Sequence, residues 1–182
     1  VLTNAHVVEE ARFDEKKKIQ ILFPGEESDS FNDQPEILQF NTKLDLSLLK
    51  IAKRPYPGIR ISELNRPELM SPILVLGYPL GKSFKSTPGF LQAYQDIRRM
   101  GEMLDLTAKV DPGNSGGPVI NGQGEVIGMI AGNFPGYNFN LAITGEKIRK
   151  FLDLENNTLN FSVVTEPEGA RVYLDGNYQG KL

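Results

Sequence analysis

The sequence contains no cysteine and only one histidine, His6, among its 182 residues. Without cysteine there is no disulfide framework, and the redox compartment of the protein cannot be inferred. Zinc sites are built mainly from cysteine and histidine, so this composition argues against a zinc centre, and we expect no cofactor. Any imidazole chemistry near neutral pH has to use His6.

Strong charge and long apolar runs are missing as well. The 20 basic and 23 acidic residues give a formal net charge of -3, which argues against a nucleic-acid-binding surface. No apolar run is long enough to span a bilayer. The chain starts at Val1 rather than methionine, shows no signal peptide, and begins and stops within a pattern, so we expect it to be part of a longer protein.

Short strands dominate the part of the sequence that has a clear pattern. One amphipathic helix is predicted at Gly145–Leu154 with Thr144 as its N-cap, and Gln92–Met100 is open between a helical turn and a long loop. Many short strands and one late helix predict an all-β barrel or sandwich. Apolar runs bounded by glycine, proline and polar residues predict strands at Ile19–Phe23, Ile37–Phe40, Leu44–Ile51, Ile73–Leu76, Leu104–Thr107, Val119–Ile120, Val126–Ala131, Phe139–Ile143, Leu159–Val164 and Arg171–Leu174.

The stretch Asp111–Val119 reads Asp-Pro-Gly-Asn-Ser-Gly-Gly-Pro-Val. Proline and glycine both disfavour a helix, so this stretch is predicted to be a tight loop before a buried strand. Glycine lets backbone N–H groups point into a small concavity. Ser115 beside such donors has what acyl transfer requires, a nucleophile and a site for the developing oxyanion. The alternative is an ordinary glycine-rich turn without chemistry.

A serine nucleophile needs a general base and a group that orients this base. His6 is the one imidazole available, and Asp45 is an isolated carboxylate in an apolar strand, where burial is costly unless the group is hydrogen-bonded. Taken alone, each of the two is more often a structural residue. The order His6, Asp45, Ser115 is that of chymotrypsin-type enzymes and differs from that of subtilisin-type and α/β-hydrolase enzymes.

Motifs around these three residues resemble those of trypsin-like serine peptidases, in particular the HtrA-like branch. The serine loop resembles the Gly-(Asp/Asn)-Ser-Gly-Gly-Pro signature of the family. Leu2–Val8 resembles its histidine motif, Asp45–Ile51 its aspartate motif, and Gly77–Gly81 the turn that opens the second barrel. The resemblance covers about residues 1 to 153 and implies a serine endopeptidase that acts on proteins or peptides.

This resemblance also implies a fold and a set of site residues. The fold is all-β, with two antiparallel β-barrels, a triad of His6, Asp45 and Ser115 between them, and an oxyanion hole made by the N–H groups of Gly113 and Ser115. We expect a peptidase domain at residues 1–153, with a partial first barrel at 1–66 and the second barrel and C-terminal helix at 67–153. Family members carry strands before the histidine motif, so the first barrel is expected to be incomplete.

The substrate pocket is implied by the resemblance too. Val110, Ala131 and Leu141 would make it small and mainly apolar. Lys109 could instead sit at the floor of the pocket and favour an acidic side chain, or it could be a surface residue at a strand end. The family pattern places the pocket at Lys109, Val110, Ala131, Gly132, Asn133, Asn140 and Leu141.

Residues 159–182 resemble the beginning of a PEGA domain, a small β-module of envelope proteins, through the run Pro167–Gly176. A generic β-hairpin is the alternative. The PEGA-like tail indicates an extracytoplasmic or cell-envelope location, and nothing in the sequence indicates the oligomeric state. A second class of function stays open, in which an inactive barrel serves as a binding or surface module, and a weaker third one is esterase-like activity on small acyl compounds.

Overall fold

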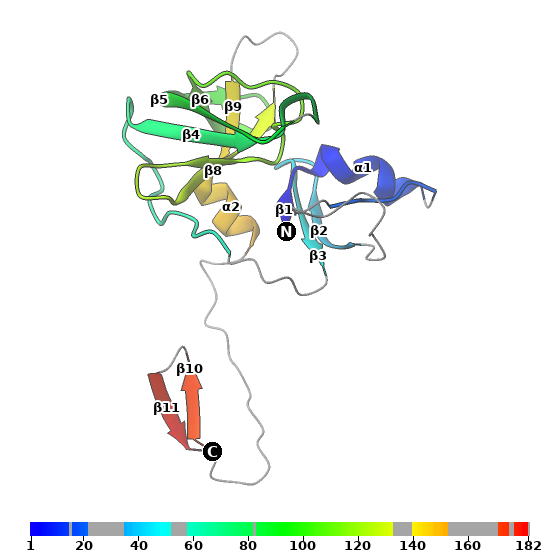
Figure 1. The fold of residues 1–182 in the computed structure, drawn as a ribbon, viewed down its shortest axis with the longest axis vertical. Coiled ribbons are helices and arrows are strands. Elements are labelled where there is room, and N and C mark those ends of the chain that lie inside the picture. Colours follow the sequence, from blue (N-terminus) through cyan, green and yellow to red (C-terminus); the bar gives the residue numbers. More distant parts are fainter. Residues whose placement is uncertain are drawn as a thin grey trace.

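The computed structural model describes residues 1–14, 16–21, 35–51, 58–81, 83–132, 140–152, 171–174 and 177–181. Two β units lie beside each other and carry the residues of the predicted triad (Figure 1). A separate two-stranded sheet is formed by β10 (Arg171–Leu174) and β11 (Asn177–Lys181).

The first unit is a three-stranded antiparallel sheet in the order β1-β3-β2, with one helix at its edge. β1 ends at Thr3 and the helix begins at Ala5, so Asn4 alone separates the sheet from the helix that carries His6. The elements of this unit are β1 (Leu2–Thr3), α1 (Ala5–Phe13), β2 (Glu36–Asn41) and β3 (Leu46–Lys50).

The second unit is a closed antiparallel barrel with the strand order β4-β5-β6-β9-β8-β7. This confirms the all-β prediction and the barrel expected in the second half of the chain. Its elements are β4 (Pro72–Gly77), the 3₁₀ turn η2 (Pro79–Gly81), β5 (Lys85–Ile97), β6 (Gly101–Leu106), β7 (Pro118–Ile120), β8 (Val126–Gly132) and β9 (Asn140–Thr144), followed by α2 (Gly145–Phe151).

Two apolar clusters hold these units together, and they follow the alternation of side chains along the strands. In β6, Leu104 and Leu106 point into the barrel, whereas Met103 points to its outer face. The outer cluster also takes in Leu46 of the first sheet and Ile148 of α2, both fully buried. The first sheet is therefore packed onto the barrel by apolar contact, and this contact decides where the two halves of the predicted triad meet.

Most of the segment Gln92–Met100, for which the sequence left two alternatives, belongs to β5. Neither a helical turn nor a long loop forms at Gln92–Met100, because the strand continues to Ile97 and a short turn at residues 98–100 leads into β6. The first half of β5 pairs with β4 and the second half with β6, with a bulge after Leu91. Its backbone hydrogen bonds therefore come from two neighbouring strands that the local pattern does not reveal.

The first unit differs from the sequence predictions in three places. Ala5–Phe13 form a helix that the sequence analysis does not predict, with Ala5 and Val8 buried on one face. Residues 19–21 of the strand predicted at Ile19–Phe23 have no regular structure, and residues 22 and 23 lie outside the described part of the chain. The strand predicted at Leu44–Ile51 starts only at Leu46, because residues 42–45 form a turn.

Near the C-terminus, the helix predicted at Gly145–Leu154 ends at Phe151, with Leu152 as its C-cap. Thr144 is its N-cap, as predicted, and its hydroxyl accepts a hydrogen bond from the N–H of Lys147 at 3.3 Å. The strand predicted at Leu159–Val164 lies outside the described residues. The strand predicted at Arg171–Leu174 is present as β10.

The cap of α2 gives a stability prediction. Thr144 is buried, so Thr144→Ala should lower the free energy of unfolding by about 1–2 kcal/mol, because the N–H of Lys147 loses its acceptor. Thr144→Ser is the matched control, since both variants lose the methyl group and only alanine loses the hydroxyl. Urea unfolding of the two variants compares them, and equal midpoints would show that the hydroxyl does not stabilise the helix.

Candidate active site

Ser115 lies in the loop between β6 and β7, and this loop rests against the turn that follows β4. The carbonyl of Pro112 accepts a hydrogen bond from the N–H of Leu80 at 2.6 Å. Gly113 has a φ of 97°, and a Cβ at this position would lie 2.4 Å from the carbonyl oxygen of Tyr78. A side chain is therefore excluded at Gly113 both by its backbone conformation and by the close approach of the turn.

The same loop also reaches the first sheet. The N–H of Gly116 donates to the carbonyl of Ile130 in β8 at 2.9 Å. A Cβ on Gly116 would lie 2.6 Å from the Oγ1 of Thr3 and 3.5 Å from the backbone nitrogen of Asn4. The residue after Ser115 thus packs directly against the junction of β1 and α1, two residues before His6.

The backbone N–H groups of the serine loop fall into two sets. Those of Asn114 and Gly117 donate to carbonyls within the loop, at 3.1 and 2.8 Å. Those of Gly113 and Ser115 donate to no acceptor within the described residues. Because the carbonyl of Pro112 is held by the turn, the N–H of Gly113 in the same trans peptide points the opposite way. Two unpaired donors beside a serine hydroxyl form an arrangement that can bind an oxyanion.

His6 and Asp45 form a close pair across the first unit. The Nδ1 of His6 lies 2.8 Å from Oδ2 and 3.0 Å from Oδ1 of Asp45, and the backbone N–H of His6 donates to Oδ1 at 3.0 Å. The carboxylate is 13% exposed and the imidazole 47% exposed. With Nδ1 turned to the carboxylate, the other ring nitrogen, Nε2, is free to take up a proton.

The electrostatics of this pair favour a charged imidazole. The hydrogen bond with Asp45 raises the pKa of His6 above its ordinary value, and the charges of Asp45 and Glu9 add to the rise. Partial burial of the ring acts in the opposite direction. The imidazole is therefore a stronger base than a free histidine, and Asp45 is the main cause.

The sequence analysis missed Asn4, which is completely buried beside this pair. Its Nδ2 donates to the backbone carbonyl of Asp45 at 3.0 Å. Asn4 occupies the N-cap position of α1, but its side chain makes no capping hydrogen bond. An asparagine two residues before the histidine is the signal that could have found it, although its partner 41 residues away could not be read from the sequence.

The predicted pocket residues surround the end of β8 and the start of β9. A Cβ on Gly132 would lie 3.4 Å from the Oγ of Ser115, so this end of β8 flanks the serine. The side chain of Lys109 is 81% exposed and pairs with Asp111 at 3.4 Å, as a surface residue does. Asn140 accepts from the N–H of Val110 and donates to the carbonyl of Leu106.

The apolar members of the predicted pocket are buried. Val110 belongs to the cluster inside the barrel, and Ala131 and Leu141 belong to the outer cluster. Their exposed fractions are all below a tenth. Asn133 lies outside the described residues.

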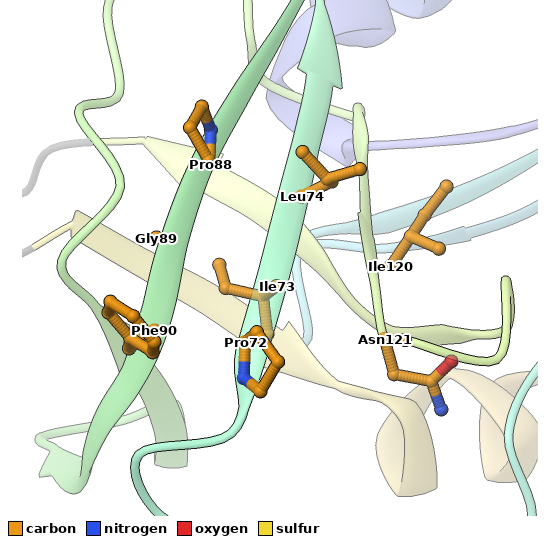
Figure 2. Close-up of a pocket in the computed structure, with 9 residues that line it drawn as sticks. Pro72, Ile73, Leu74, Pro88, Gly89, Phe90, Ile120 and Asn121 are labelled. Atoms are coloured by element: carbon orange, nitrogen blue, oxygen red, sulfur yellow. The ribbon is translucent and has the colours of Figure 1, made fainter.

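A separate apolar groove of about 470 Å³ opens on the outside of the barrel (Figure 2). It is formed by β4, β5 and the end of β7, and contains none of the residues predicted for the active site. Leu74 and Phe90 are partly exposed on it. The residues that line it are Pro72, Ile73, Leu74, Pro88, Gly89, Phe90, Ile120, Asn121 and Gly122.

The described residues contain no group of three or more histidine, cysteine, aspartate or glutamate side chains placed to hold a metal ion. Among the described helices, none has the length and the apolar character needed to cross a membrane.

Several curated relatives of this sequence are named as serine proteases, some of them HTRA1 or HtrA-like. The chain is 32% identical to serine protease HTRA1 of Xenopus tropicalis over 168 residues, covering 86% of this chain and 34% of the relative. It is 29% identical to the putative serine protease HhoB of Synechocystis over 136 residues, covering 71% of this chain and 30% of that protein. The chain thus spans about a third of the length of these relatives.

Solved structures show the same fold at lower identity. The active form of the Rv3671c protease from M. tuberculosis superimposes with a TM-score of 0.69 at 20% identity, covering 84% of this chain and 67% of that one. The family model described as a trypsin-like peptidase domain matches residues 1–129 of this chain. These residues include His6, Asp45 and Ser115. Because this match extends over more than half of the sequence, the chain belongs to the family of trypsin-like peptidase domains.

Proposed function

We propose that this chain is the catalytic part of a serine endopeptidase that hydrolyses peptide bonds through His6, Asp45 and Ser115. The observation that carries the proposal is the pairing of His6 with Asp45 through Nδ1, which leaves Nε2 as the base. Contact of Gly116 with the β1–α1 junction supports the presence of Ser115 on the same side. Names of the curated relatives agree with this activity.

The first half of the proposed reaction forms an acyl-enzyme. The Oγ of Ser115 attacks the carbonyl carbon of the substrate while His6 Nε2 takes the hydroxyl proton. The N–H groups of Gly113 and Ser115 stabilise the oxyanion of the tetrahedral intermediate. His6 then donates its proton to the leaving amine, the C–N bond breaks, and an ester to Ser115 remains.

The second half removes the acyl group. A water molecule gives a proton to Nε2 of His6 and attacks the ester carbonyl, again through an oxyanion. His6 returns the proton to Ser115 Oγ, and the carboxylic acid product leaves. Asp45 keeps Nδ1 protonated and stabilises the imidazolium in both halves.

We further propose the finer properties that the sequence indicates. Residues 159–182 would begin a PEGA-like module in an extracytoplasmic or envelope protein, and the antiparallel pairing of β10 and β11 agrees with a small β-module. An inactive barrel that acts as a binding or surface module is the competing function, and the first experiment below separates the two.

Ser115→Ala tests the nucleophile in the full-length protein. A serine-directed fluorophosphonate should label the unmodified protein and not the variant, and peptide hydrolysis should fall by several orders of magnitude. Ser86→Ala is the control, because Ser86 is an exposed serine on β5. Equal labelling of unmodified protein and Ser115→Ala would reject the assignment, and no labelling of either would favour the inactive module.

The pH dependence of kcat/KM tests the base. Activity should fall on acidification with a single-proton slope, because a protonated His6 cannot accept the serine proton. Since Asp45 raises the pKa of His6, the midpoint should lie above the ordinary histidine value of about 6.5. In Asp45→Asn the midpoint should fall, and turnover should drop by roughly 10⁴. A kcat/KM that does not change as the pH passes through the titration of His6 would show that His6 is not the base.

Substrate preference tests the predicted pocket. We expect small or medium apolar side chains before the cleaved bond, because Val110, Ala131 and Leu141, which the sequence assigns to the pocket, are apolar and the side chain of Lys109 is 81% exposed. Such a site discriminates weakly, by about 1–3 kcal/mol per methylene. A peptide library measures the preference, and cleavage mainly after glutamate or aspartate would assign the pocket to Lys109 instead.

A further inference from the structure

The start of α1 is capped in an unusual way. An N-cap asparagine normally accepts a hydrogen bond from the second or third N–H of its own helix. Here Asn4 is the N-cap but makes no such bond, and the second N–H, that of His6, donates to the carboxylate of Asp45 at 3.0 Å. Asp45 therefore caps the helix from another element, and its negative charge lies at the positive end of the helix.

The side chain of Asn4 has a different partner. Its Nδ2 donates to the backbone carbonyl of Asp45 at 3.0 Å. The side chain of Asn4 therefore binds the backbone of Asp45 instead of capping α1. The side chain of Asp45 caps α1 in its place. Each of the two depends on the other for its place.

The backbone of Asp45 needs such support. Its φ of 54° lies in the left-handed region, which a residue with a side chain adopts at a cost of about 1–2 kcal/mol. It is the last residue of the turn at 42–45, immediately before β3. A change of φ toward negative values would turn the Cα–Cβ bond, and the carboxylate would move away from His6.

Asn4 itself is in a costly position. The residue is completely buried, and its Oδ1 has no hydrogen-bond partner within the described part of the chain. A buried oxygen without a hydrogen-bond partner lowers the stability of the folded state. Departures of this kind from local rules are expected where a function requires them.

We propose that Asn4 is a positioning residue of the active site, which fixes the left-handed backbone of Asp45 and through it the carboxylate that orients His6. The inference rests on the proposed function for its effect on turnover. Its structural part, the control of the His6–Asp45 pair by Asn4, can be measured without any activity.

Two substitutions separate this role from helix capping. Asn4→Ser keeps a good N-cap residue, whereas Asn4→Ala removes the cap group, so serine should be the more stable of the two. Neither side chain has the amide that donates to the carbonyl of Asp45. Both variants should therefore show the same change at His6 although their stabilities differ. Val7→Ala is the control, because Val7 is an exposed residue of the same helix.

The experiment measures the His6 imidazole by proton NMR titration in the full-length protein, with His6→Gln to assign the resonance. In both Asn4 variants the midpoint should fall toward the ordinary histidine value of about 6.5, because the raising effect of Asp45 is weakened. The acid limb of kcat/KM should move in parallel, kcat should fall about 10- to 100-fold, and KM should change little. Val7→Ala should leave the His6 midpoint, the acid limb of kcat/KM, kcat and KM unchanged.

Unchanged His6 midpoints in both folded Asn4 variants would overturn the proposal. A change in the His6 midpoint and in kcat that is large in Asn4→Ala and absent in Asn4→Ser would also overturn the proposal. Such a result would parallel the stabilities of the two variants and would assign Asn4 to helix capping alone. If the unmodified protein has no peptidase activity, the proposed function fails, but a lower His6 midpoint in both variants would still support the positioning role.

Discussion

The apolar contact between the first sheet and the outer face of the barrel is the constraint on which the candidate active site depends. Leu46 of β3 is buried in one apolar cluster with Leu141 and Ile143 of β9 and Ile148 of α2. His6 and Asp45 belong to one side of this contact and Ser115 to the other. Burial of apolar surface contributes about 25 cal/mol per Å² and has no preferred direction. It brings the two halves together but cannot orient one side chain toward another.

Orientation comes from polar and close backbone contacts at the edge of the apolar cluster. Gly116 packs on Thr3, the Asn4 amide holds the carbonyl of Asp45, and the carboxylate of Asp45 binds both the backbone and the ring of His6. On the opposite side of the serine loop, the turn after β4 holds the carbonyl of Pro112. These contacts are directional and short, so they fix angles that burial leaves free.

Unusual backbone conformations gather around the same place. Four non-glycine residues of the described chain have positive φ, and two of them are Asp45 and Leu80. Asp45 binds the imidazole of His6, and the N–H of Leu80 donates to Pro112 in the serine loop. Gly113 and Gly116 on either side of Ser115 also have positive φ. At Asp45 and Leu80 the left-handed conformation costs free energy and persists only when its surroundings require it, whereas glycine adopts positive φ without this cost. Here the surroundings are contacts between segments far apart in the chain, which explains why the strain lies at the meeting point of the two units.

The sequence by itself indicated the family of trypsin-like peptidase domains and the three residues that we propose for its active site. Ser115 is predicted from its tight glycine- and proline-rich loop, and His6 because the chain offers no other imidazole. The short strands alone predict a barrel or a sandwich, and the resemblance to trypsin-like peptidases implies the barrel. Only the tertiary structure decided that His6 lies in the first turn of a helix, that β5 extends to Ile97, and that the side-chain amide of Asn4 donates to the carbonyl of Asp45. Each of these depends on hydrogen bonds between residues distant in sequence, and local propensity carries no information about such partners.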